Sequence, residues 1–191
     1  TGFYTQDTGR IMINGMDAAS INVRDIRSRT ALVMQEPVLF SGTIRDNICP
    51  YGSQITDQVL EAALKNAHCG FLFEKFSGLD TVIKEGGQPL SSGEKQLVCI
   101  ARAFAFNPDL IIFDEATSYM DSQSETSVHD AMKKLMKGRL TIIIAHRLST
   151  VRNCNTILLL RDGMIREKGS HHQLVKSKGE YYYLLKKEKI Q

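Results

Sequence analysis

The chain has 191 residues, of which 42% are hydrophobic and 24% are charged, and its formal net charge is +3. This length fits one domain with at most a small subdomain, and the small charge argues against a nucleic-acid partner. No apolar run approaches the roughly 18 residues that span a bilayer, so any membrane link must lie outside this chain. The four cysteines are scattered and form no CxxC pair, and buried free thiols are favoured over disulfides.

The first half of the chain shows two short strands, a helix and a loop. Residues 11–13 and 30–34 are short apolar stretches, which favour strands. Residues 56–68 carry apolar side chains at helical spacing after a Thr-Asp start, and this pattern predicts a helix. The polar, glycine-rich residues 77–90 predict a loop.

A longer helix is predicted from Ser91 to about Phe106. Its segment LSSGEKQ has the Ser-x-x-Glu spacing of a capping box, which starts a helix. The exposed N–H groups at such a start also favour phosphate. Gly93 is not needed for capping, and a glycine in the first turn lets another group approach the backbone closely. The Asn107-Pro108 pair predicts the end of the helix.

The second half alternates apolar strands with helices. Residues 110–114 and 140–146 are continuous apolar runs, typical of strands buried on both faces of a parallel sheet. A helix beginning at Asp121 separates them. The Asp162-Gly163 pair predicts a hairpin, and two short helices follow. This order predicts an α/β fold with helices on both faces of the sheet and ligands at the carboxyl ends of the strands.

Three polar positions lie at these strand ends. Asp114 and Glu115 are adjacent acids, of which one could hold Mg²⁺ through its waters and the other could orient or deprotonate a water. The alternative is a solvated strand end. His146 is either functional or a capping residue, and Gln35 is either a polar exit residue or a contact to metal-bound water.

Taken together, the segments LSSGEKQLVCIARA, NPDLIIFDEATSYMDSQSE and IIIAHRLSTV resemble the nucleotide-binding domain of ABC transporters in order and spacing. VLFSGTIRDNI is similar to the exporter branch, and the chain looks most like bacterial multidrug or lipid exporters. The resemblance implies a P-loop NTPase-like ABC ATPase core with a mainly parallel sheet. Residues 1–40 and 107–191 would form this core, and roughly 41–106 an α-helical subdomain with the signature motif.

The resemblance also implies roles for the residues at the strand ends. Glu115 matches the catalytic glutamate, and His146 matches the histidine that contacts the γ-phosphate. Asp114 and Gln35 match residues that organise Mg²⁺. Gln35 and Glu85 match residues that meet the membrane domain, so that ATP hydrolysis would be coupled to export.

Two further motifs follow from the resemblance, and both would serve a head-to-tail dimer. The signature residues that would contact the partner's ATP are Ser91, Ser92, Gly93 and Glu94, and the D-loop includes Ser118 and Asp121. The sequence departs from the family pattern at Ser92, Glu94 and Met120, which replace Gly, Gln and Leu. We expect the Glu94 carboxylate to face away from phosphate.

The family's phosphate loop, GxxGxGK[ST], is absent, and no glycine in the sequence is followed by lysine. We therefore expect an N-terminally truncated chain that binds ATP poorly in its own half-site. The implied cofactors are ATP and Mg²⁺. The implied partners are a transmembrane domain and a second nucleotide-binding domain, identical or not, at the cytoplasmic face of a bacterial plasma membrane. The alternatives are a soluble ABC-type ATPase and a catalytically silent partner half.

Overall fold

The computed structural model describes residues 2, 4, 6–49, 55–114, 122–145 and 147–188. The chain separates into two compact units, Thr1–Ile142 and Ile143–Gln191. The predicted division into a core and a helical subdomain stays a prediction. None of the helices in the described ranges has both the length and the apolar surface needed to cross a membrane.

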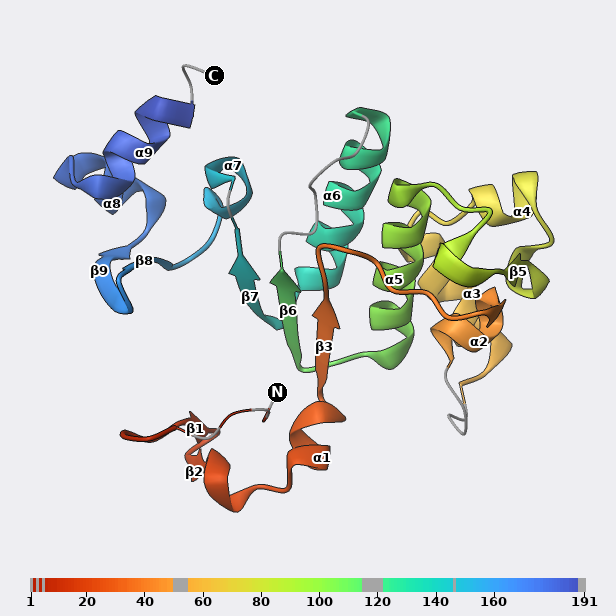
Figure 1. The fold of residues 1–191 in the computed structure, drawn as a ribbon, viewed down its shortest axis with the longest axis horizontal. Coiled ribbons are helices and arrows are strands. Elements are labelled where there is room, and N and C mark those ends of the chain that lie inside the picture. The colour runs from red at the N-terminus through yellow and green to blue at the C-terminus, as the bar shows by residue number, and fades with distance from the viewer. Residues whose placement is uncertain are drawn as a thin grey trace. The chain divides into compact units, whose positions relative to one another are not determined.

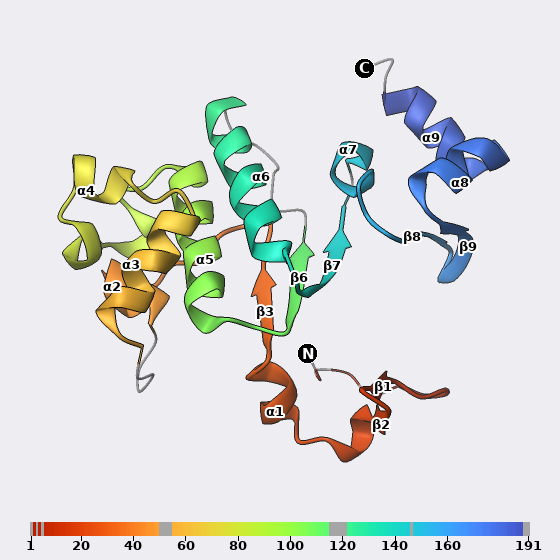
Figure 2. The ribbon, with the colours of Figure 1, turned by 180° about the vertical axis from the view of Figure 1, so that it is seen from behind.

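A three-stranded sheet of order β3-β6-β7 organises the fold (Figure 1). β3 (Thr30–Val33) and β6 (Leu110–Asp114) run parallel, with Val33 opposite Phe113. β7 (Leu140–Ile144) is the third strand. Figures 1 and 2 show helix α6 (Ser122–Met136) on one face of this sheet. The predicted α/β fold with a parallel sheet is confirmed.

One part of that prediction is wrong, because the strands are not buried on both faces. On β6, Ile111 and Phe113 are buried, whereas Leu110 and Ile112 are only partly buried. On β7, Leu140 is 68% exposed and Ile142 is 49% exposed. In the described part of the chain no strand pairs with the far edge of β7. An apolar run becomes a buried strand only where other elements cover it, and here part of the apolar surface is left open.

Helix α5 (Ser92–Phe106) packs against α6 and against the helices that precede it. It ends at Asn107, which has a left-handed conformation (φ 49°), directly before Pro108, as predicted. The apolar face of α6 is buried, with exposures of 0–2%, at Val128, Ala131, Met132 and Leu135. The close α5–α6 pair supports the first turn of α5, which contains the residues predicted as the signature motif.

Short elements surround α5. Helices α2 (Ile44–Ile48) and α3 (Asp57–Asn66) pack on it, and α4 (Phe71–Lys75) follows α3. α3 confirms the predicted helix, with shorter bounds. The strands β4 (Gly42–Thr43) and β5 (Val82–Ile83) pair antiparallel. Short 3-10 turns cover Gly78–Asp80 (η2) and Glu85–Gly87 (η3).

The start of the chain carries a small hairpin of β1 (Met12–Ile13) and β2 (Met16–Asp17). A 3-10 turn, Ala18–Ser20 (η1), and helix α1 (Val23–Arg27) connect it to β3. The strand predicted at residues 11–13 is therefore confirmed, although it is short and exposed.

The described residues of the second unit form a hairpin and three helices. The strands β8 (Ile157–Arg161) and β9 (Met164–Gly169) meet at Asp162 and Gly163, which both have positive φ, as the predicted turn requires. Ile157, Leu174 and Tyr181 form its small core. The helices of this unit are α7 (Leu148–Val151), α8 (His171–Ser177) and α9 (Glu180–Glu188).

The four cysteines are free thiols, as predicted. Cys69 is buried, and burial raises the pKa of its thiol. Cys49, Cys99 and Cys154 are only partly buried, so the prediction of buried thiols holds for one of the four. The described ranges contain no group of three or more His, Cys, Asp or Glu side chains placed to hold a metal ion.

Candidate functional site

The signature segment forms a complete capping box at the start of α5. The Glu94 amide donates to Ser91 Oγ over 3.3 Å, and the Ser91 amide donates to Glu94 Oε2 over 2.9 Å. These reciprocal bonds satisfy two N–H groups that would otherwise lack an intrahelical partner. The capping box predicted from the sequence is therefore present. Ser91 and Ser92 are both exposed, so the beginning of the helix is open to solvent.

The Glu94 carboxylate is occupied on both oxygens. Oε2 accepts from the Ser91 amide, and Oε1 accepts from Lys75 Nζ at the end of α4 over 3.0 Å. Burial raises the pKa of Glu94, but the bonds from Ser91 and Lys75 outweigh it and hold the pKa below its usual value. The carboxylate is thus ionised at neutral pH and is directed to these two partners.

Gly93 is buried where α5 packs closely against Ser124 of α6. A Cβ placed on Gly93 would lie 2.5 Å from Ser124 Cβ and 2.7 Å from Ser124 Oγ. Such distances are far below van der Waals contact, so any side chain here would push the two helices apart. The structure therefore gives Gly93 a packing role inside the chain, besides the ligand approach that the sequence suggested.

Gln96, one turn further along α5, connects this helix to the end of β3. Its side chain is fully buried, and Nε2 donates to the Met34 carbonyl over 3.2 Å. Its Oε1 has no hydrogen-bond partner among the described residues. Met34 directly precedes Gln35, so this bond holds the signature helix beside the Gln35 backbone. The sequence analysis did not identify Gln96, because a buried amide within an apolar helix gives no sign of its partner.

Asp114 and Gln35 lie at the same edge of the sheet. Asp114 ends β6, and Gln35 is the second residue after β3, the parallel neighbour of β6. Both side chains are exposed. Mg²⁺ is commonly held by one or two carboxylates with water and phosphate oxygens, rather than by an all-protein cage. An exposed carboxylate and an exposed amide at the same edge of the sheet fit this kind of binding.

Glu85 lies in the η3 turn, ahead of the signature segment. Its side chain is exposed, and the turn is tied to α5 because Lys95 Nζ donates to the Gly86 carbonyl over 2.6 Å. A Cβ on Gly87 would lie 2.7 Å from Lys95 Cε, which shows how closely this lysine packs on the turn. The position of Glu85 is therefore coupled to the first turn of α5.

Four predicted site residues lie outside the described residues, and their roles stay predictions: Glu115, Ser118, Asp121 and His146. The structure brings Gln35, Asp114 and the signature residues into one unit. It gives no geometry for the general base or for the γ-phosphate contact.

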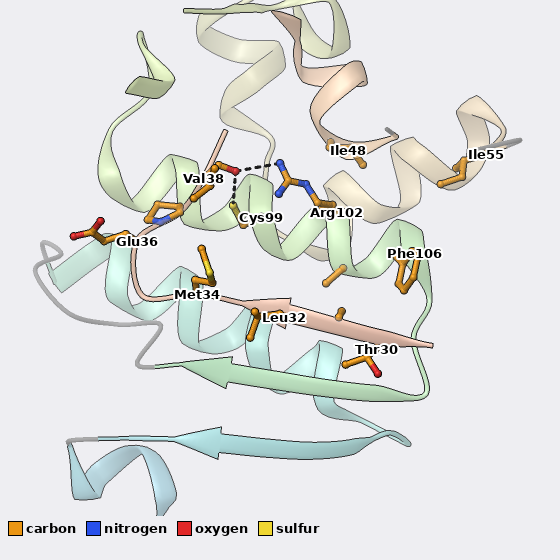
Figure 3. A pocket seen from close by; sticks show the side chains of 13 residues that line it. Thr30, Leu32, Met34, Glu36, Val38, Ile48, Ile55, Cys99, Arg102 and Phe106 are labelled. Atoms are coloured by element: carbon orange, nitrogen blue, oxygen red, sulfur yellow. Dashed lines mark hydrogen bonds between the residues drawn. The ribbon is translucent and has the colours of Figure 1, made fainter. Parts of the chain in front are cut away.

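A cavity of about 520 Å³ lies between β3, the segment after it, and α5 (Figure 3). Arg102 crosses this region. Its Nε donates to the Asn47 carbonyl over 2.6 Å and its Nη2 to the Val38 carbonyl over 3.2 Å. Cys99 Sγ also donates to Val38, over 3.8 Å. The sequence does not predict this network, because Arg102 has the pattern of an ordinary polar residue in a helix.

We expect Arg102→Lys to lower the free energy of unfolding by about 1 kcal/mol. A lysine ammonium lacks the planar fork that lets one side chain donate to both carbonyls. Urea unfolding at fixed pH measures the change. Arg24→Lys on the exposed α1 is the matched control and should be neutral; equal losses in both variants would contradict the role of the network.

The fold and the site together define a class of protein. Strand β6 of the parallel sheet ends in Asp114. Helix α5, which is capped by a Ser-Ser-Gly-Glu segment, is held against the end of β3 by the hydrogen bond of Gln96. This is the arrangement of an ABC-type ATPase domain. The chain belongs to the ABC transporter family: the profile of that family matches residues 1–118. The predicted resemblance is confirmed.

Relatives and solved structures agree with this assignment. The chain is 43% identical over 188 residues to ATP-binding cassette sub-family B member 5 of Homo sapiens, covering 98% of this chain and 15% of the relative. It is 44% identical over 185 residues to the ATP-dependent lipid A-core flippase of Syntrophus aciditrophicus (strain SB), covering 95% of this chain and 30% of the relative. A structure of a bacterial Atm1-family ABC exporter with ATP bound matches with TM-score 0.87 and 38% identity, over 98% of this chain and 33% of that chain.

Proposed function

We propose that this chain is the ATP-hydrolysing module of an ABC exporter. It spans between 15% and 30% of the length of the two relatives named above, so transport itself would need parts of a larger protein. The observation that carries the proposal is the bond from Gln96 to Met34. This bond joins the signature helix to the strand end that leads into Gln35, beside the end of β6 at Asp114.

The first turn of α5 is suited to contact a phosphate. The capping box uses the amides of Ser91 and Glu94, which leaves those of Ser92 and Gly93 for a ligand. Backbone N–H groups at a helix start favour anions, and both serines are exposed. We propose that this turn contacts the γ-phosphate of ATP held by a second nucleotide-binding domain, identical or different, in a head-to-tail dimer.

Asp114 and Gln35 would hold Mg²⁺, and Glu115 would orient and deprotonate the attacking water. His146 would contact the γ-phosphate and keep Glu115 in register with it. Bound Mg²⁺ would neutralise charge that develops on the phosphate oxygens. Phosphoryl transfer needs positioning and charge stabilisation more than covalent chemistry, and these four residues supply groups for both.

Coupling to a membrane domain would pass through Gln35 and Glu85. Gln35 follows the strand that Gln96 holds, and the turn of Glu85 is tied to α5 by Lys95. Closing of the dimer, with Ser118 and Asp121 of the D-loop at its interface, would move α5 and so displace both positions. The module would therefore work at the cytoplasmic face of a membrane; a bacterial plasma membrane stays a prediction.

Asp114→Asn in the complete transporter subunit tests the metal role. We expect the Mg²⁺ concentration that gives half-maximal ATP hydrolysis to rise by about 10- to 100-fold, because the amide removes the negative charge that holds the ion. Titrating ATPase activity with Mg²⁺ measures this. Asp25→Asn on α1 removes the same charge from an exposed helix and should leave the titration unchanged. An unchanged titration in Asp114→Asn would contradict the proposed site.

A further inference from the structure

The contact between Lys75 and Glu94 joins α4 to the first turn of the signature helix. Lys75 Nζ lies 3.0 Å from Glu94 Oε1, across 19 residues of sequence. We propose that Lys75 is a positioning residue for nucleotide binding: its ammonium compensates the carboxylate that this chain carries in its signature motif and holds it away from the bound phosphate. This inference rests on the proposed function of the signature helix.

An uncompensated Glu94 would oppose that function. It is the only acidic residue in the first turn of α5, the turn whose free amides would meet the phosphate. A carboxylate there complements the helix dipole, but it repels a second anion brought to the same helix end. The resemblance leads us to expect a glutamine here, which would carry no charge and cause no such repulsion.

The surroundings of Glu94 make the repulsion significant. The Glu94 side chain is only 16% exposed, so water screens its charge less than that of a surface carboxylate. The capping bond to the Ser91 amide fixes one oxygen at the helix start. Glu94 therefore cannot swing into solvent without losing the cap, and its charge has to be balanced where it stands.

Among the residues that the structure describes, Lys75 is the cation in contact with this carboxylate. The lysine in the first turn of α5 itself, Lys95, directs its ammonium to the Gly86 carbonyl in the η3 turn. Lys75 is 61% exposed, so its contact with Glu94 adds little to folding stability. Its effect should appear instead in the affinity for a third charged group, the phosphate.

A double-mutant cycle in the complete transporter subunit tests this role, with KM for ATP and kcat measured separately. Lys75→Met should raise KM by about threefold to tenfold with a smaller change in kcat, because the unbalanced carboxylate repels ATP before it affects chemistry. Glu94→Gln keeps the capping box and should lower KM. In the Glu94→Gln background, Lys75→Met should raise KM less than in the parent, because only the ammonium's own attraction for ATP is then lost. A role of Lys75 that is independent of Glu94 would give equal effects in both backgrounds.

Two additional variants separate charge from structure. Lys75→Arg keeps the charge and should restore KM to the parent value, whereas Lys65→Met removes an exposed lysine from α3 and should leave KM unchanged. Equal effects of Lys75→Met with and without Glu94 would overturn the inference, as would no effect of Lys75→Met alone. A parent subunit without ATP hydrolysis would overturn the proposed function as well, and this outcome is recognisable before any variant is made.

Discussion

Glu115→Gln is expected to leave ATP binding intact and to lower turnover by about 10²- to 10⁴-fold, the usual contribution of a general base. Glutamine has nearly the same shape and can still accept a hydrogen bond from water, but it cannot take up the proton. The variant belongs in the complete transporter subunit. ATP binding is measured by equilibrium titration, and turnover by phosphate release at saturating ATP and Mg²⁺.

Comparison with a variant of Asp114, the neighbouring acid, separates a loss of the general base from a loss of Mg²⁺ binding. Asp114→Asn should shift the Mg²⁺ titration, whereas Glu115→Gln should lower kcat at every Mg²⁺ concentration. Glu61→Gln on the exposed face of α3 makes the same chemical change away from the site and should have no effect. If Glu115→Gln hydrolyses ATP at the parent rate, Glu115 is not the general base, even though the family assignment still holds.

Local sequence signals predicted the parts of the fold that depend on neighbouring residues. The Ser91–Glu94 spacing gave the capping box, and Asn107-Pro108 gave the end of α5. The Asp162-Gly163 pair gave the hairpin with its two positive φ angles. In each case the stabilising bonds join residues a few positions apart, so one short stretch of sequence is enough to predict the element.

Contacts between distant residues could not be predicted in this way. Lys75 is 19 positions from Glu94, and Gln96 is 62 positions from Met34. The exposure of Leu140 on β7 shows the same limit, because an apolar run has the same sequence whether or not another element covers it. Those contacts depend on how α4, α5 and β3 pack, and they determine how the signature helix is held.

Gly93 shows how a functional pattern and a packing requirement coincide at one residue. The glycine belongs to the signature motif, and its backbone lies against Ser124 of α6. A clash there would act on folding and on ATP contact together, so a single substitution cannot assign the loss to either cause. A second substitution is therefore needed that makes room for a side chain at position 93 by shortening the side chain opposite it.

Gly93→Ala is expected to lower the free energy of unfolding by about 1–3 kcal/mol and to abolish ATP-dependent activity, because the new methyl group meets Ser124 Cβ at 2.5 Å. Urea unfolding of the chain and ATPase activity of the complete transporter subunit measure the two effects. Ser92→Ala changes the exposed neighbouring position and should leave stability within about 0.5 kcal/mol of the parent.

Adding Ser124→Gly to Gly93→Ala separates the two roles, because it removes both atoms, Cβ and Oγ, that come closest to the new methyl group. Stability should recover toward that of Ser124→Gly alone, since the helices can again approach. If activity recovers as well, Gly93 serves packing only. If stability recovers and activity stays lost, the backbone at Gly93 must stay open to the nucleotide. A double variant no more stable than Gly93→Ala would contradict the clash with Ser124 as the cause.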